Sequence, residues 1–316
     1  MSGWLRHCAV ACFFNLLLLF NAVAAPHVWI VLSEESGSYQ ETATVLRAEL
    51  AGSAEIFLSG GPFLLSEQKF TPDLIVTVGV AALDGVLDHL EKRGWQGVQV
   101  LATLLPQSAV DARQSRMPNR AGAFSAVVLD QPVSRQMALI RRALPGRDAL
   151  AVPLGPHSRA SEDTVKRQAA AHGLLLIPTP VINQADEIFS TFRTGLESAQ
   201  VILALPDATV YNPASLQNIL LMTYRARVPL IAFSPAYVKA GALVAVYSTP
   251  AQVARRTARA VRALLTGRPI PALMRPDEFE VATNPRVAAS LGLTIDDADA
   301  IARDLRGMAG GGLIAG

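Results

Sequence analysis

The stretch that decides the fold is Ala199–Arg256, AQVILALPDATVYNPASLQNILLMTYRARVPLIAFSPAYVKAGALVAVYSTPAQVARR. Short apolar runs in it alternate with segments of helical composition. Continuous apolar runs of this length, separated by helices, predict buried parallel strands in an α/β protein. The runs cover residues 201–205, 228–233 and 242–247, and the helices cover about 213–226 and 250–265.

Polar residues follow two of these runs, and ligands of parallel sheets bind beyond the carboxyl ends of the strands. We therefore expect Asp207, Ser234 and Tyr237 at a binding site. The Asp207 carboxylate can pair with a ligand ammonium, or it can cap the segment that follows it. Tyr237 can stack on a ligand ring or donate its hydroxyl, or it can pack against a hinge.

The same alternation extends through the rest of the chain and predicts further strand-end loops. Ser33 and Ser36 follow the run 28–32, where they can bind a ligand anion or simply cap the next helix. His157 follows the run 149–154 and can touch ligand, although a lone histidine is more often a surface residue or a donor at a helix start. The predicted fold class is α/β, with two Rossmann-like lobes of mainly parallel sheets joined by a hinge.

The segments LPDATVYNPASLQNIL, RVPLIAF and YVKAGALVAVYSTPAQVAR resemble the substrate-binding components of ABC transporters whose known members take up aromatic amino acids. The match is best from about Ala149 to Leu293. The resemblance implies a type I periplasmic-binding-protein fold. It also implies that Asp207 contacts the amine of a ligand, because the matching aspartate does so in the relatives.

Two other stretches differ from the sequences of these relatives. The relatives place a hydroxyl residue after the glycine that matches Gly79, where this chain has Val80. The backbone N–H groups of Val80 and Ala81 can still donate, since they begin a predicted helix. The relatives cross between lobes through a glycine-rich segment, which matches AGAFSAVVLDQP here. We expect Phe124 and Ser125 at the cleft on that basis, with core packing of Phe124 as the alternative.

The predicted organisation divides the chain into a signal peptide, two lobes and a tail. Lobe 2 is an insertion, so the chain leaves lobe 1 and returns to it. The predicted ranges are 1–24 for the signal peptide, 25–125 for the first part of lobe 1, 126–233 for lobe 2, 234–270 for the return to lobe 1, 271–306 for a C-terminal crossover strand and helices, and 307–316 for a disordered tail.

Residues 1–24 have the features of a cleaved secretory signal. Arg6 precedes the apolar run AVACFFNLLLLFNAVA, and Ala22–Ala24 fits a small-x-small cleavage site. Both cysteines, Cys8 and Cys12, lie in this segment, so the mature chain is predicted to contain no disulfide or thiolate site. We expect a periplasmic location, given a Gram-negative source.

Composition and motifs favour binding over catalysis. A formal net charge of +2 over 316 residues gives no argument for a nucleic-acid partner. The chain has no GxSxG, HExxH, Walker A or GxGxxG motif, and its five histidines have no metal-ligand spacing. We therefore predict no enzyme activity, no cofactor and no metal.

Two functions remain on this evidence. The first is a monomeric, extracytoplasmic solute-binding protein of an ABC importer, which binds a small amino-acid-like ligand by hinge closure and docks on a membrane permease. The alternative is a periplasmic sensor or adaptor that keeps the binding-protein fold without transport. Val80 and the altered segment at Phe124 and Ser125 motivate the alternative.

Overall fold

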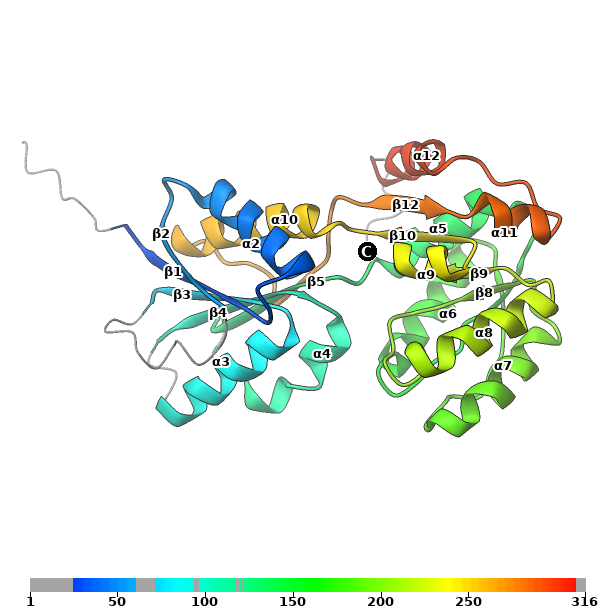
Figure 1. Cartoon of the computed structure of the whole chain (residues 1–316), viewed down its shortest axis with the longest axis horizontal. Coiled ribbons are helices and arrows are strands. Elements are labelled where there is room, and N and C mark those ends of the chain that lie inside the picture. Colours follow the sequence, from blue (N-terminus) through cyan, green and yellow to red (C-terminus); the bar gives the residue numbers. More distant parts are fainter. Residues whose placement is uncertain (1–24, 61–71, 94–96, 118–119, 121, 311–316) are drawn as a thin grey trace, which may run out of the picture.

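The computed structural model describes residues 25–60, 72–93, 97–117, 120 and 122–310. These residues form two six-stranded sheets, each at the centre of its own lobe (Figure 1). We call the lobe around the first sheet lobe 1 and the lobe around the second sheet lobe 2. The predicted signal peptide and residues 311–316 lie outside the described residues.

The sheet of lobe 1 has the strand order β11-β5-β4-β3-β1-β2, and all its neighbouring pairs are parallel. Its strands are β1 (His27–Leu32), β2 (Glu55–Ser59), β3 (Leu74–Val78), β4 (Gln99–Leu105), β5 (Phe124–Val128) and β11 (Leu273–Met274). Its helices are α2 (Gly37–Leu50), α3 (Val80–Arg93), α4 (Gln107–Asp111), the 3-10 turn η2 (Gln114–Arg116) and α10 (Pro250–Leu265).

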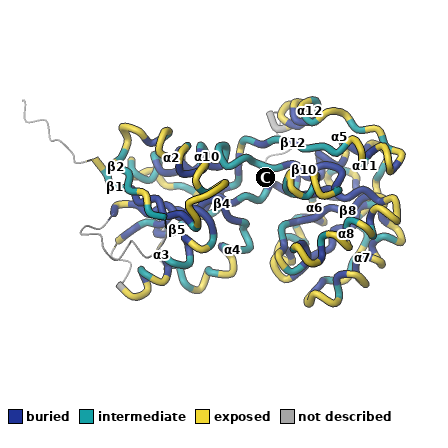
Figure 2. Tube along the Cα trace, viewed as in Figure 1, coloured by how far each residue is buried: buried dark blue, intermediate teal, exposed yellow. Residues whose placement is uncertain are grey.

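Both faces of this sheet are buried, which explains the continuous apolar runs. Successive side chains of a strand point to opposite faces, and β1 divides accordingly. Val28 and Ile30 pack with residues of α2 and α10, whereas Trp29 and Val31 pack with residues of α3. Figure 2 shows the resulting buried layer inside each lobe.

The sheet of lobe 2 has the order β12-β10-β9-β8-β6-β7, and only its β10–β12 pair is antiparallel. Its strands are β6 (Ala149–Ala151), β7 (Leu175–Ile177), β8 (Val201–Leu203), β9 (Leu230–Ala232), β10 (Val244–Tyr247) and β12 (Glu280–Thr283). Its helices are α5 (Val133–Ala143), η3 (Arg159–Ser161), α6 (Glu162–Ala171), η4 (Ala185–Glu187), α7 (Ile188–Leu196), α8 (Pro213–Arg225), α9 (Pro235–Ala240), α11 (Pro285–Ser290) and α12 (Ala298–Gly310).

The predicted α/β class with two mainly parallel sheets is confirmed, but the lobe boundaries differ from those predicted. Strand β5 pairs with β4, so the chain leaves lobe 1 at 129–132, after the predicted boundary at 126. Strand β10 pairs with β9, so the return to lobe 1 comes at Ser248 and not at residue 234. An apolar run shows that a strand is buried but does not show which sheet it joins.

The C-terminal part also differs from the prediction. Strand β11 pairs with β5 in lobe 1, and β12 pairs with β10 in lobe 2, so the third crossing lies at 275–279. Helix α12 continues to Gly310, so residues 307–310 are helical and not part of a disordered tail. Its buried Ile301 and Leu305 pack in the core of lobe 2, which holds the helix in place.

Three crossing segments connect the lobes, and buried polar groups join them. Gln131 Nε2 donates to Ser248 Oγ (2.9 Å), which donates to the Glu278 carbonyl (2.5 Å). Arg135 donates to Gln131 Oε1 (2.6 Å) and to the Pro276 carbonyl (3.2 Å). These bonds tie all three crossings together near one point.

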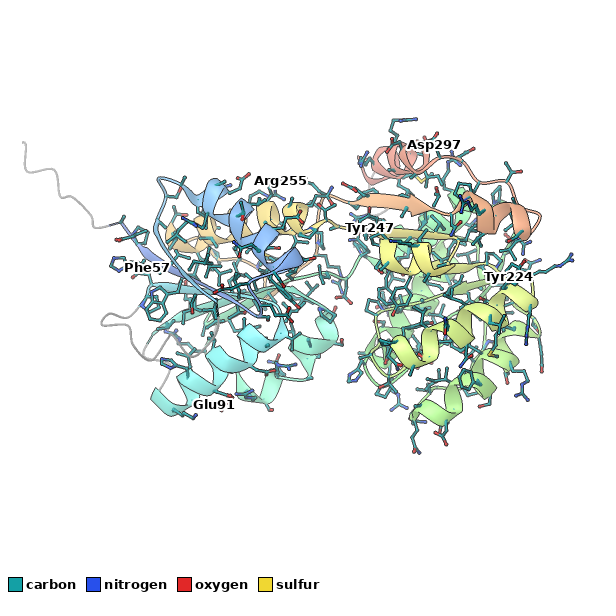
Figure 3. The ribbon with its side chains drawn as sticks, viewed as in Figure 1. Phe57, Glu91, Tyr224, Tyr247, Arg255 and Asp297 are labelled. Carbon is teal, nitrogen blue, oxygen red and sulfur yellow. The ribbon has the colours of Figure 1, made fainter. Side chains whose placement is uncertain are left out.

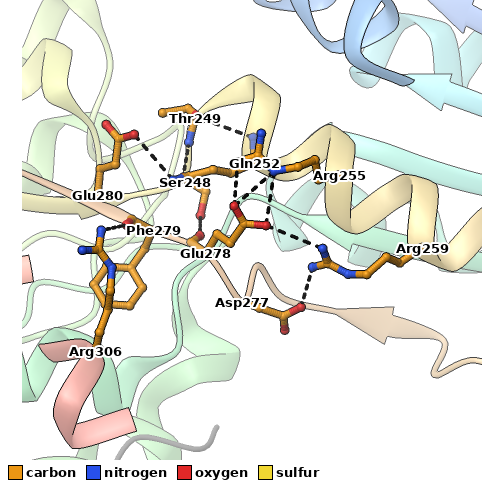
Figure 4. A network of polar contacts seen from close by, with 10 residues as sticks. All are labelled: Ser248, Thr249, Gln252, Arg255, Arg259, Asp277, Glu278, Phe279, Glu280 and Arg306. Carbon is orange, nitrogen blue, oxygen red and sulfur yellow. Dashed lines mark hydrogen bonds and ion pairs between the residues drawn. The ribbon is translucent and has the colours of Figure 1, made fainter. Parts of the chain in front are cut away.

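Two further features fix this hinge on either side (Figure 4). On lobe 1, Thr249 and Gln252 form a capping box that starts α10 directly after the crossing. On lobe 2, the Arg306 guanidinium donates to the Phe279 carbonyl (3.0 Å) and lies over its ring. Hydrogen bonds therefore connect the hinge to both lobes.

Candidate functional site

A cavity of about 400 Å³ lies between the lobes, where strands of both sheets end. Ligands of open parallel sheets bind at this edge, and the volume suits a small molecule. The residues that line it are Pro106, Ser108, Leu129, Asp130, Gln131, Pro206, Asp207, Ala208, Tyr211, Phe233, Ser234, Pro235, Tyr237, Tyr247 and Ser248.

Aromatic rings form one wall of this cavity. The Phe233 and Tyr237 ring centroids are 4.7 Å apart, and Tyr211 packs edge-on against both at 6.0 and 6.5 Å. Tyr247 adds a fourth ring from the end of β10, where the two lobes meet (Figure 3). Contacts of this kind hold the rings in fixed positions. The wall therefore offers a rigid apolar surface to a ligand.

Asp207 lies at the end of β8 and is only 3% exposed. Its Oδ2 accepts three hydrogen bonds of 2.9 Å, from the backbone of His157 and from the backbone and hydroxyl of Ser158. Its Oδ1 accepts from the backbone of Thr209 (3.0 Å) and Val210 (3.3 Å). A carboxylate has about four lone-pair sites, so the protein's own donors engage the whole group.

Asp207 was predicted either to pair with a ligand ammonium or to cap the segment that follows it. The hydrogen bonds above show that it caps that segment. The carboxylate also ties down the loop after β6. Gly155 belongs to this arrangement, because a Cβ there would lie 2.6 Å from Asp207 Oδ2. A contact with a ligand amine would have to share oxygens that are already bonded, and that role stays a prediction.

Tyr211 has the most unusual polar group in the cavity wall. Its side chain is 5% exposed, and within the described part of the chain its hydroxyl has no hydrogen-bond partner. Burial and the nearby Asp207 carboxylate raise the pKa of Tyr211, so the hydroxyl stays neutral. An unpaired buried hydroxyl costs about 1–3 kcal/mol. A polar ligand atom that bonded to it would recover that cost.

Asp130 brings a second carboxylate to the cavity, from the first crossing. It accepts a hydrogen bond from the backbone of Gln107 (2.6 Å). Burial raises the pKa of Asp130, and the charge of Arg275 acts in the opposite direction. The cavity therefore contains two acidic groups in addition to its aromatic wall.

The structure brings together four of the predicted site residues. Asp207, Ser234 and Tyr237 line the cavity, and Tyr237 donates its hydroxyl to the Tyr211 carbonyl (3.0 Å). His157 lines an adjoining recess, and its backbone N–H holds Asp207. All four belong to lobe 2: Asp207, Ser234 and His157 lie in segments that follow strands, and Tyr237 lies in α9.

Predicted residues of lobe 1 lie elsewhere. Ser36 lines a neighbouring recess, whereas Ser33 Oγ accepts from the Ala82 backbone (3.0 Å) and so caps α3. Val80 packs on the core below α3, and Ala81 is exposed without lining the cavity.

The predicted cleft residues Phe124 and Ser125 also lie away from the cavity. They begin β5, whereas its carboxyl end leads to the cavity-lining Leu129. Phe124 packs on the core of lobe 1, as its alternative interpretation has it, and Ser125 is buried.

Sequence reasoning missed several cavity residues. Tyr211 and Phe233 form the aromatic wall, and Asp130, Gln131 and Tyr247 come from the ends of β5 and β10. Phe233 and Tyr247 each end an apolar run, which was a usable signal. Asp130 and Gln131 were not recognisable, because the crossing was expected a few residues earlier.

No group of three or more potential metal ligands occurs among the described residues. Within the same residues no helix has the length and apolar character that crossing a membrane requires.

Several solved structures share this fold at low sequence identity. The ligand-free, open structure of a substrate-binding protein with adhesive properties from Clostridium difficile has a TM-score of 0.64 and 14% identity, over 86% of this chain and 96% of that one. An ABC domain from Streptococcus pneumoniae in complex with L-Trp has a TM-score of 0.56 and 18% identity, over 87% and 98%. A conserved domain protein from Vibrio cholerae has a TM-score of 0.57 and 19% identity, over 88% and 98%.

The family is shown by the sequence itself. The model of the ABC transporter substrate binding protein family matches residues 121–302, which is more than half of the chain. The chain therefore belongs to the ABC transporter substrate-binding proteins. No curated protein sequence is similar enough to count as a match.

Proposed function

We propose that this protein is an extracytoplasmic solute-binding protein that captures a small molecule between its lobes and delivers it to an ABC permease. One observation carries the proposal. The cavity takes its lining from both lobes and from two of the crossings. A ligand there touches both halves at once, so binding can change the angle between them.

Hinge closure follows from this geometry. The lobes have separate cores and are joined by three short crossings. A ligand that contacts both lobes stabilises the closed arrangement by its difference in affinity for the two states. The aromatic wall supports an aromatic ligand, and the L-Trp bound by the pneumococcal protein supports an amino-acid-like one.

The test is a ligand screen of residues 25–316 by thermal shift, with amino acids, amines, nucleobases, sugars and small carboxylates. A ligand that binds only the folded state raises the melting temperature. Small-angle scattering should then show a smaller radius of gyration with the ligand than without it. A well-folded protein that responds to none of these compounds contradicts solute binding and favours the sensor or adaptor function.

The cellular part of the proposal has its own test. We propose that residues 1–24 direct the chain to the periplasm, are cleaved, and leave a monomer. N-terminal sequencing of protein from the periplasmic fraction should begin near residue 25, and light scattering should give the monomer mass. An uncleaved N-terminus would contradict the signal peptide, and a dimer mass would contradict the monomer.

A further inference from the structure

The cavity between the lobes is acidic. Asp130 and Asp207 line it, and none of its lining residues is lysine, arginine or histidine. Arg275 lines the adjoining recess, where its guanidinium donates to Gln107 Oε1 (2.6 Å). Glu34 adds a carboxylate to the recess on the other side. A ligand carboxylate would therefore meet two acidic side chains and no cationic side chain in the cavity itself.

Three positions that line the cavity have no backbone donor. Proline stands at the carboxyl end of three strands that border the cavity: Pro106 after β4, Pro206 after β8 and Pro235 after β9. Proline carries no N–H. At these three positions the backbone therefore has no N–H to offer an anion.

Most side-chain donors of the cavity are engaged within the protein. The hydroxyl of Tyr237 donates to the Tyr211 carbonyl, and that of Tyr247 donates to Glu280 Oε2 (3.2 Å). Ser248 and Gln131 take part in the hinge bonds described above. The hydroxyls of Ser108, Ser234 and Tyr211 are the remaining side-chain donors of the lining, and that of Tyr211 is buried.

The groups that remain suit a cation with an aromatic or apolar body. A cation is attracted to the face of an aromatic ring, and the cavity has four such rings beside two carboxylates. The hydroxyl of Tyr211 has no partner in the described chain, but its oxygen is buried, so an ammonium group could bond to it only after the wall shifts.

From these observations we infer that the cavity binds aromatic amines that lack a carboxylate, with Asp130 as counter-ion and the Tyr211–Phe233–Tyr237 wall against the ring. The inference rests on the proposed function, because it names the ligand class of the same cavity. It differs from the amino-acid ligand expected from resemblance. The affinities of an amine and an amino acid with the same ring system distinguish these two ligand classes.

Calorimetric titration with tryptamine and tryptophan, and with tyramine and tyrosine, provides the test. We expect each amine to bind at least about tenfold more tightly than its amino acid. Equal or tighter binding of the amino acids overturns the inference while leaving solute binding intact. If no member of the two pairs binds but another solute of the screen does, the inference fails while the proposed solute binding stands. If no solute binds, both proposals fail.

A variant pair tests the role of Asp130. Asp130→Asn keeps the side-chain size and removes the charge, and we expect it to weaken tryptamine binding about tenfold or more. Asp163→Asn, at an exposed position of α6, makes the same change in net charge away from the cavity and should leave binding unchanged. Circular dichroism melts show whether both variants fold. Equal affinities for tryptamine in the two folded variants overturn the assignment of Asp130.

Discussion

The two lobes share one strand arrangement but contribute unequally to the cavity between them. From its free edge, each sheet runs second strand, first strand, third, fourth and fifth, and a late crossover strand closes the other edge. Lobe 2 supplies the aromatic wall and Asp207, whereas lobe 1 supplies only Pro106 and Ser108 ahead of the crossings. The same topology therefore supplies most of the cavity wall in one lobe and a small part of it in the other.

The difference begins in the loops at the strand ends. In lobe 1, the loop after β1 is fixed to α3 by one bond, from the Ala82 backbone to Ser33 Oγ. In lobe 2, the corresponding loop after β6 is fixed by the buried carboxylate of Asp207. A loop held by several charge-assisted bonds keeps its shape without ligand. We infer that lobe 2 is ready to bind before the lobes close.

The largest expected effect comes from breaking this cross-link. Asp207→Ala leaves the donors of His157, Ser158, Thr209 and Val210 without their acceptor, and an unpaired buried donor costs about 1–3 kcal/mol. Since water can reach some of them, we expect a loss of about 3 kcal/mol in the free energy of unfolding. Urea denaturation followed by circular dichroism measures it.

The matched change in lobe 1 is Ser33→Ala, which removes a single capping bond. We expect it to cost about 1 kcal/mol. If the two variants lose the same stability, the strand-end loops of the lobes are held equally well, and the contrast between them disappears.

A smaller effect concerns ligand affinity. Phe233→Leu keeps apolar volume in lobe 2 but removes the ring that packs against Tyr237. For the solute that gives the largest thermal shift, we expect about tenfold weaker binding by calorimetry. Ser108→Ala changes the wall of lobe 1 and should weaken binding less than about threefold. The reverse ranking would make lobe 1 the main binding surface.

Much of the fold could be predicted from the sequence, because apolar runs and capping signals are local. The run 74–78 is β3 with the same bounds, and Pro250 marks the start of α10. The lobe boundaries could not be predicted in this way. The apolar sequence of residues 242–247 is compatible with a strand in either sheet. Only the packing of distant segments determines that it pairs with β9 in lobe 2.

The candidate site shows the same limit. Residues directly after a strand, such as Asp207 and Ser234, were found because strand ends are visible in the sequence. Their partners were not, since Tyr211 lies beyond a turn and reaches the cavity through its packing on Phe233. Phe124 was misplaced because resemblance located the crossing, but the strand runs on to Val128 before the chain crosses.

The smallest expected effect is the pH dependence of the ion pair between lobe 1 and the third crossing. Arg255 on α10 of lobe 1 donates to Glu278 in the third crossing (2.6 Å, Figure 4). The hydrogen bond from Arg255 holds the pKa of Glu278 below its usual value of 4.5. The folded state therefore favours the charged form. The pair contributes stability above about pH 4.5, and that contribution is lost as pH falls through the lowered pKa.

Both side chains are 38% exposed, so solvent screening limits the contribution to less than about 1 kcal/mol. Glu278→Gln should lower the free energy of unfolding by this small amount at about pH 7. The difference from the parent protein should shrink as pH falls through the lowered pKa of Glu278, because the parent carboxylate then also becomes neutral. A difference that stays constant with pH would show that the pair acts through packing, and that charge does not couple lobe 1 to the third crossing.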